Sequence, residues 1–178
     1  WAEAVDSVER ATDLSVAAHP VLSAPDTPAA KSVKPGDKAP DFTLRDTSGK
    51  TWQLSKLRGK AVLLDFGRVT CIACQGIAGE LQRFNGAYAK QGLQILAINM
   101  DGAMAFMVPK FREERKLTFP FLLDRENKVP TEYGVETIPF LVLVGPDGKV
   151  KFTHVGYDPG FRKTVETAIR AALPTKKR

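Results

Sequence analysis

Two cysteines, Cys71 and Cys74, are the only ones in the 178-residue chain, and they lie where one hydrophobic pattern gives way to another. Residues 61–66 (AVLLDF) form a short apolar run, as in a strand that is buried on both faces of a sheet. From Cys74 onward, apolar residues recur every three or four positions until Gly92, which predicts an amphipathic helix. The cysteines are therefore expected at the junction between a buried strand and a helix.

This position favours redox chemistry. The unpaired N–H groups and the positive dipole end at a helix N-terminus stabilise a thiolate relative to a thiol. The thiolate is the nucleophile in thiol-disulfide exchange. Cys71 should lie at the exposed tip of the helix, whereas Cys74 begins the buried face. We therefore assign nucleophilic attack to Cys71 and resolution of the resulting mixed disulfide to Cys74.

Three other interpretations of the cysteine pair compete with this one. A structural disulfide across two intervening residues would restrain the unfolded chain very little. A closed zinc site needs four ligands, and besides scattered carboxylates the chain offers only His19 and His154. Two ordinary buried cysteines could also meet at this spacing by coincidence. The pattern favours redox activity over all three, with no metal and no cofactor other than the Cys71–Cys74 disulfide.

The composition excludes several classes of protein. With 43% hydrophobic and 26% charged residues, the chain is expected to be a soluble globular protein of one domain. No apolar run is long enough to span a bilayer. The net charge of +6 is spread among acidic residues except at residues 176–178, so no nucleic-acid partner is expected. The start at Trp1 rather than Met is compatible with removal of an upstream export signal or membrane tether.

The chain is predicted to divide into two parts. Residues 1–36 form an N-terminal extension, with a short helix within residues 1–16 and then a linker rich in Pro, Ala, Ser and Lys. Residues 37–178 form the folded domain. Its alternating patterns predict a β-hairpin, then strands and helices in turn, then a second hairpin and a last helix. The expected ranges are 41–54 (hairpin), 61–66, 93–99 and 119–123 (strands), 74–91, 103–116 and 129–133 (helices), 140–155 (hairpin) and 161–173 (helix).

The order of these elements, with a Cys-x-x-Cys pair opening the first long helix, resembles the thioredoxin superfamily, and specifically the TlpA/ResA-like thiol-disulfide oxidoreductases. The resemblance covers about residues 37–173. Its motifs are GDKAPDFTL (36–44), SKLRGK (55–60), CIAC (71–74), TIP (137–139) and GPDG (145–148). It implies an α/β, thioredoxin-like fold, in which a central mixed β-sheet is flanked by helices and preceded by an N-terminal β-hairpin. It also implies a periplasmic or otherwise extracytoplasmic protein, tethered through an N-terminal segment.

Two positions acquire catalytic roles from this resemblance. Asp65 matches a buried carboxylate beneath the disulfide, where burial would raise its pKa and allow it to exchange a proton with Cys74. The alternative is a solvated carboxylate at the end of the strand. Pro139 matches a cis proline that packs against the disulfide and leaves the backbone of Ile138 free to pair with a substrate. The alternative is an ordinary trans proline that ends a loop.

The remaining substrate-binding residues surround the first cysteine. We assign Thr70, Ile72 and Ala73 to this surface together with Ile138. Thr70 stands where the family usually has Trp, and it is expected to cap the helix. Neither residue between the cysteines is the family's usual Pro. Because of these differences from the family, the motif does not decide whether the protein reduces or oxidises its partners.

Further departures concern the helix and the loop before it. Ile77 replaces an acidic residue that the family often carries, so Asp65 is the one proton acceptor that the motif offers. Gly67 stands where the family has a second Trp, and Gly79 where it has a helix-kinking Pro.

The expected partners are proteins that carry thiols or disulfides, and family analogy adds components of cytochrome c maturation. Two alternative functions stay open. A thiol peroxidase needs a Thr three positions before its reactive cysteine, and this chain has Arg68 there. A thioredoxin-fold binding module would instead use the two thiols to hold a soft metal such as copper(I).

Overall fold

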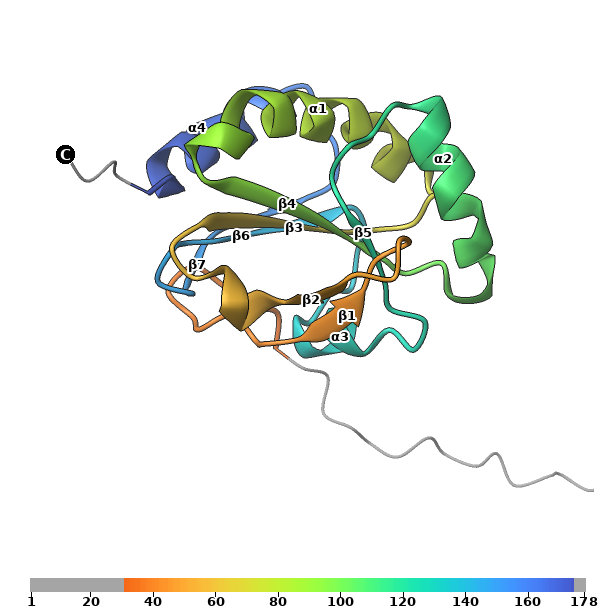
Figure 1. The fold of residues 1–178 in the computed structure, drawn as a ribbon. Coiled ribbons are helices and arrows are strands. Elements are labelled where there is room, and N and C mark those ends of the chain that lie inside the picture. The colour runs from red at the N-terminus through yellow and green to blue at the C-terminus, as the bar shows by residue number, and fades with distance from the viewer. Residues whose placement is uncertain (1–30, 175–178) are drawn as a thin grey trace, which may run out of the picture.

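A mixed sheet of five strands forms the centre of the computed structural model, which describes residues 31–174 (Figure 1). Its strand order is β5-β4-β3-β6-β7. The central strand β3 (Ala61–Gly67) runs parallel to β4 (Leu93–Asn99) and antiparallel to β6 (Phe140–Val144). The outer strands are β5 (Phe121–Leu123), parallel to β4, and β7 (Val150–Val155), antiparallel to β6.

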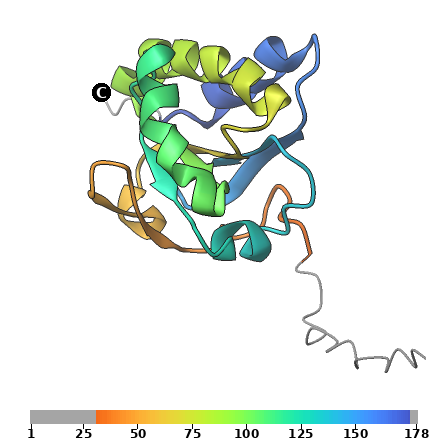
Figure 2. The ribbon, with the colours of Figure 1, turned by 90° about the vertical axis from the view of Figure 1, so that its right-hand side faces the viewer.

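Helices cover one face of this sheet, and the N-terminal hairpin covers the other (Figures 1 and 2). The helical face carries α1 (Ile72–Tyr88), α2 (Val108–Glu114) and α4 (Phe161–Ala172). The opposite face carries β1 (Thr43–Arg45), β2 (Thr51–Gln53) and α3 (Lys128–Glu132). Short 3₁₀ segments connect these elements: η1 (Leu54–Leu57), η2 (Ala89–Gln91) and η3 (Gly102–Met107).

Two hydrophobic cores form because successive side chains of a strand point to opposite faces of the sheet. Leu63 of β3 packs toward α1 and α4, where Ile77 and Val165 are fully buried. Leu64 and Phe66 pack toward the hairpin on the other face. Every residue of β3 is buried, as the continuous apolar run predicts. The α/β, thioredoxin-like fold class is therefore confirmed.

The helix expected over residues 103–116 is divided in the structure. The 3₁₀ segment η3 comes first, and the α-helix α2 begins only at Val108. Pro109 lies in the first turn of α2, where its missing N–H breaks no helical hydrogen bond. The strand expected over residues 119–123 is also shorter, since β5 begins at Phe121.

The N-terminal part of the described chain packs against the domain. The side chain of Val33 is buried, and its N–H donates to the carbonyl of Tyr133 at 3.2 Å. The helix and most of the linker predicted for residues 1–36 lie outside the described residues. Within residues 31–174, no helix combines the length and apolar character needed to cross a bilayer.

The hairpin also contacts the edge of the sheet. Asp46, in the turn between β1 and β2, forms an antiparallel bridge with Leu122 of β5. The N–H of Thr47 donates to the carbonyl of Phe121 at 3.2 Å. At the opposite edge, the N–H of Gly36 donates to the carbonyl of Val150 at 2.9 Å.

Strand directions place four loops at one edge of the sheet. Strands β3 and β4 end there, β6 begins there, and β7 ends there. The segment between β3 and α1, which holds Cys71, thus lies at the same edge as η3, as Ile138-Pro139 before β6, and as the connection from β7 to α4.

Candidate active site

Cys71 is the N-cap residue of helix α1, directly before its first residue Ile72. Its backbone is extended (φ −92°, ψ 121°), and its Sγ accepts a hydrogen bond from the N–H of Cys74 at 3.2 Å. The cap predicted at Thr70 is therefore wrong. The Thr70 hydroxyl instead donates to Asp101 at 2.8 Å, and the cysteine sulfur takes the capping position one residue later.

The two thiols differ in their exposure to solvent. Cys71 is partly exposed, whereas the Cys74 side chain is buried. Burial raises the pKa of the Cys74 thiol, and the hydrogen bond with Cys71 and the charge of Asp65 raise it further. The pair therefore offers one sulfur to a partner and keeps the other protonated inside the protein.

Asp65 lies beneath this pair, on the face of β3 that packs against α1. Only 9% of the residue is exposed, so the alternative of a solvated carboxylate is wrong. Its Oδ1 has no hydrogen-bond partner within the described residues. Burial raises the pKa of Asp65 from 3.8 to about 7. A carboxyl group with such a pKa can both take up and release a proton near neutral pH.

Gly67 opens the space that connects Asp65 with Cys74. A Cβ atom at position 67 would lie 3.3 Å from the Cys74 Sγ and 3.7 Å from the Asp65 Oδ1. A cavity of about 20 Å³ occupies this region, lined also by Phe119 and Phe121, and it has room for about one water molecule. From the sequence, Gly67 appeared only as a position without the family's Trp; nothing in its local pattern indicated the cavity.

Ile138 and Pro139 flank the same end of β3. The peptide bond between them is cis, so the trans alternative is wrong. Pro139 is buried and Ile138 is partly exposed. The Pro139 carbonyl accepts from the N–H of Gly156 at 2.8 Å. Neither backbone group of Ile138 has a backbone partner in the part of the chain that is described, so both are available to another strand.

Asp101 holds the segment before Cys71 in place. Its Oδ2 accepts from the N–H of Val69 at 2.7 Å, and its Oδ1 accepts from the Thr70 hydroxyl at 2.8 Å. The amide of Asn99 also donates to Oδ2. Asp101 was not identified from the sequence. A signal was present, because the polar residues Asn99 and Asp101 stand at the end of a buried strand, at the same edge as the end of β3.

The predicted substrate-binding residues lie around Cys71 with different degrees of exposure. Ile72 is 87% exposed, and Ala73 is partly exposed. Thr70 is exposed, although its hydroxyl is engaged with Asp101. The structure thus brings these three residues to one surface with the partly exposed Cys71.

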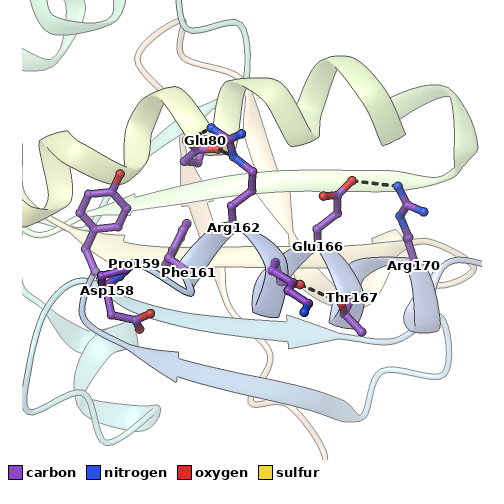
Figure 3. A pocket seen from close by; sticks show the side chains of 10 residues that line it. Glu80, Asp158, Pro159, Phe161, Arg162, Glu166, Thr167 and Arg170 are labelled. Atoms are coloured by element: carbon purple, nitrogen blue, oxygen red, sulfur yellow. Dashed lines mark hydrogen bonds and ion pairs between the residues drawn. The ribbon is translucent and has the colours of Figure 1, made fainter.

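A groove much larger than the cavity beside Cys74 lies elsewhere, between α1 and α4 (Figure 3). This groove of about 790 Å³ contains neither cysteine. Arg162 donates two hydrogen bonds of 2.7 Å to the carboxylate of Glu80, and Arg170 donates to Glu166 at 3.0 Å (Figure 3). Arg162 and Arg170 are thus paired with acidic side chains, and the groove holds no thiol, so the reactive chemistry belongs to the smaller cysteine site.

Known proteins resemble this chain in sequence and in fold. Residues 35–153 match the AhpC/TSA family. The thiol-disulfide oxidoreductase ResA of Geobacillus thermodenitrificans is 39% identical over 120 residues, which cover 67% of this chain and 68% of the relative. ResA of Bacillus subtilis is 34% identical over 120 residues, covering 67% of this chain and 66% of the relative.

Solved structures agree with the sequence relatives. A protein of Chlorobium tepidum described as thiol:disulfide interchange protein DsbE has a TM-score of 0.74 and 33% identity. The match covers 79% of this chain and 99% of that protein. A thiol:disulfide interchange protein from Bacteroides sp. has a TM-score of 0.67 and 26% identity, covering 79% and 93% of the two chains. This chain therefore belongs to the AhpC/TSA family, as a ResA-like thiol-disulfide oxidoreductase of the thioredoxin superfamily.

Proposed function

We propose that Cys71 is the nucleophile and Cys74 the resolving residue of a dithiol that reduces a disulfide in a partner protein. The Cys71 thiolate attacks one sulfur of the partner disulfide, forms a mixed disulfide and releases the other partner sulfur as a thiolate. The Cys74 thiolate then attacks the Cys71 sulfur and releases the partner. Two electrons pass to the partner, and the Cys71–Cys74 disulfide forms without any other cofactor. The reverse sequence oxidises a partner dithiol.

Asp65 accepts the proton that Cys74 must lose before it can attack. The buried position of both groups and the small cavity between them support this role. An ionised Asp65 is poorly solvated where it lies, so protonation by Cys74 relieves an unfavourable charge. The transfer passes directly between the two groups or through one water molecule in the cavity.

The partner segment binds beside the cis peptide bond. The free backbone groups of Ile138 offer two hydrogen bonds to an extended strand, in the manner of β-strand addition. Thr70, Ile72 and Ala73 complete the contact on the other side of Cys71.

The observation that carries this proposal is the difference between a partly exposed Cys71 and a buried Cys74 beside Asp65. The test uses Cys71→Ser and Cys74→Ser in an insulin-reduction assay. Both variants should lose turnover, and only Cys74→Ser should accumulate a trapped mixed disulfide with a partner. Turnover equal to that of the parent in both variants would remove the catalytic assignment. Trapping only by Cys71→Ser would reverse the two roles.

We also propose where the protein acts and with whom. The family resemblance supports an extracytoplasmic location, a tether through the N-terminal extension of residues 1–36 ahead of the domain of residues 37–178, and partners among the proteins of cytochrome c maturation. In intact cells, a membrane-impermeant thiol reagent should label Cys71 after reduction. Labelling only after cell lysis would contradict an extracytoplasmic site.

A further inference from the structure

Both backbone groups of Val69, two residues before Cys71, are bound by side chains from other segments. Its N–H donates to the Oδ2 of Asp101 at 2.7 Å, and its carbonyl accepts from the Nε2 of Gln75 at 2.7 Å. Asp101 follows β4, and Gln75 belongs to α1. Val69 is buried and lies outside the sheet and the helices, so these two side chains decide where its backbone lies.

Gln75 is held at the other end of its amide by the end of α2. The guanidinium of Arg115 donates to the Gln75 Oε1 at 3.0 Å. The same guanidinium lies over the ring of Phe111, with its Cζ 4.8 Å from the ring centroid. The Gln75 amide thus uses its donor on the loop before Cys71 and its acceptor on Arg115, which fixes the orientation of both.

The loop that Gln75 binds lies against the sulfur of Cys74. Its backbone approaches the sulfur at Gly67, where a Cβ atom would lie 3.3 Å from the Cys74 Sγ. Arg68 and Val69 line the small cavity beside Cys74. Burial raises the pKa of the Cys74 thiol, whereas a hydrogen bond from the Arg68 backbone acts in the opposite direction because it stabilises the thiolate.

We propose that Gln75 is a positioning residue for the second step of exchange, in which Cys74 attacks the sulfur of Cys71. By binding the carbonyl of Val69, Gln75 keeps the backbone N–H of Arg68 directed at the Cys74 sulfur. Gln75 directly follows Cys74 in α1, so it ties the loop to the helical turn that carries this sulfur. The proposal rests on the assignment of Cys74 as the resolving residue.

Loss of the Gln75 donor should affect the two steps of exchange unequally. The carbonyl of Val69 would lose its partner, and the loop could move away from Cys74. A thiolate with a weaker hydrogen bond is less stable, so less of it is present near neutral pH. The greater nucleophilicity of a more basic sulfur offsets about half of this effect on a logarithmic scale. The first attack, by Cys71, does not require the Cys74 thiolate.

The test follows the reaction of reduced protein with one equivalent of dithiobis(nitrobenzoate) by stopped flow. In the first phase, the Cys71 thiolate attacks the reagent, forms a mixed disulfide and releases one chromogenic thiolate, at a rate that depends on concentration. In the second phase, Cys74 loses its proton, attacks the Cys71 sulfur and releases the other chromogenic thiolate, at a rate independent of concentration. Two electrons pass from the protein to the reagent, and the Cys71–Cys74 disulfide forms.

Gln75→Met should slow the second phase about threefold at neutral pH and shift its pH profile to higher pH, while the first phase changes less than about twofold. Arg115→Met removes the support of the Gln75 amide but keeps its donor, and it should slow the second phase about twofold. The titratable groups that act on Cys74, which are Asp65 and Cys71, are unchanged in both variants.

Gln82→Met is the matched control. Gln82 lies about two turns further along α1, and its amide also joins the helix to another segment. It donates to the Thr118 hydroxyl at 3.0 Å and accepts from the Thr118 N–H at 2.9 Å. The same substitution therefore removes the hydrogen bonds of a glutamine of α1 at a place remote from Cys74. Both phases should keep the rates of the parent.

A second phase as fast in Gln75→Met as in the parent would overturn the proposal. An equal slowing of both phases in Gln75→Met, or an equal slowing of the second phase by Gln82→Met, would overturn it as well, because either result would indicate a general loosening of α1. If Gln75→Met does not fold, Arg115→Met decides by the same criteria. If the parent released only one chromogenic thiolate per molecule, Cys74 would not be the resolving residue, and the proposed exchange mechanism would fail together with this proposal.

Discussion

Asp65 and Cys74 border the same small cavity, and the absence of a side chain at Gly67 keeps that cavity open. The carboxyl group and the thiol are both buried, and the charge of Asp65 raises the pKa of the Cys74 thiol. This relationship makes the second step of exchange, rather than the first, the step most sensitive to changes inside the protein.

Gly67→Ala should slow the resolution of the mixed disulfide. The added Cβ would lie 3.3 Å from the Cys74 Sγ, so the thiol must shift away from its present position. A small displacement of the reacting thiol should lower the rate of resolution about tenfold. Stopped-flow measurement of the mixed-disulfide lifetime checks this. Gly79→Ala is the control, because an added Cβ there meets nothing within 4 Å; it should raise stability by about 0.5–1 kcal/mol and leave the lifetime unchanged.

Asp65→Asn should stabilise the oxidised protein at neutral and alkaline pH. The pKa of Asp65 is raised from 3.8 to about 7 by burial, so the native state binds its proton more tightly than the unfolded state does. This contribution to stability is fully present below pH 3.8 and is lost as the pH rises through about 7. The variant should therefore gain up to about 4 kcal/mol relative to the parent by pH 8.

Urea unfolding at pH 4 and pH 8 measures this gain. The oxidised form is used because its cysteines do not titrate. A stability difference between Asp65→Asn and the parent that is the same at both pH values would show that Asp65 is not the group responsible. The same variant should slow the resolution step, because it lacks the proton acceptor.

Asp101→Ala should destabilise the protein and loosen the segment before Cys71. The N–H of Val69 loses its acceptor in a buried surrounding, which costs about 1–3 kcal/mol. Thr70→Val removes only the weaker, exposed contact with Asp101 and should cost less than about 1 kcal/mol. Chemical denaturation measures both. Equal losses in the two variants would contradict the assignment of Val69 as the main contact.

Gly76→Ala should displace Tyr157 from α1. The new Cβ would come within 2.9 Å of the half-exposed ring, so the ring must shift away from the helix. Nitration of Tyr157 by tetranitromethane should become faster, as mass spectrometry of the digested protein would show. Gly86→Ala, also an exposed position of α1, meets nothing within 4 Å and should leave the nitration rate unchanged. An unchanged rate in Gly76→Ala would indicate that the ring does not rest on this glycine.

Local patterns in the sequence were sufficient to predict the strand-to-helix junction, and they favoured a buried Asp65, which the family resemblance also implied. Asp65 stands within an apolar run, between Leu64 and Phe66, and such a run predicts a buried strand. The exposed Cys71 and buried Cys74 followed from the helical period that begins after them.

The remaining features depend on contacts between segments that are distant in sequence. Thr70 was expected to cap α1 because a hydroxyl is a good local acceptor, but Asp101, 31 residues away, binds that hydroxyl instead. The cavity at Gly67 and the seat of Tyr157 on Gly76 likewise require the relative positions of β3, α1 and the end of β7. No local pattern carries that information, since each contact joins loops that meet only when the sheet is assembled.

The hairpin of β1 and β2 has a further consequence through its bridge between Asp46 and Leu122. An outer strand with unpaired backbone groups is a template on which other chains can polymerise. The hairpin pairs with part of the β5 backbone, and the N–H of Gly36 pairs with the first residue of β7. Both outer strands of the described sheet thus have part of their backbone paired within the chain itself, which lowers the tendency of the protein to aggregate edge to edge.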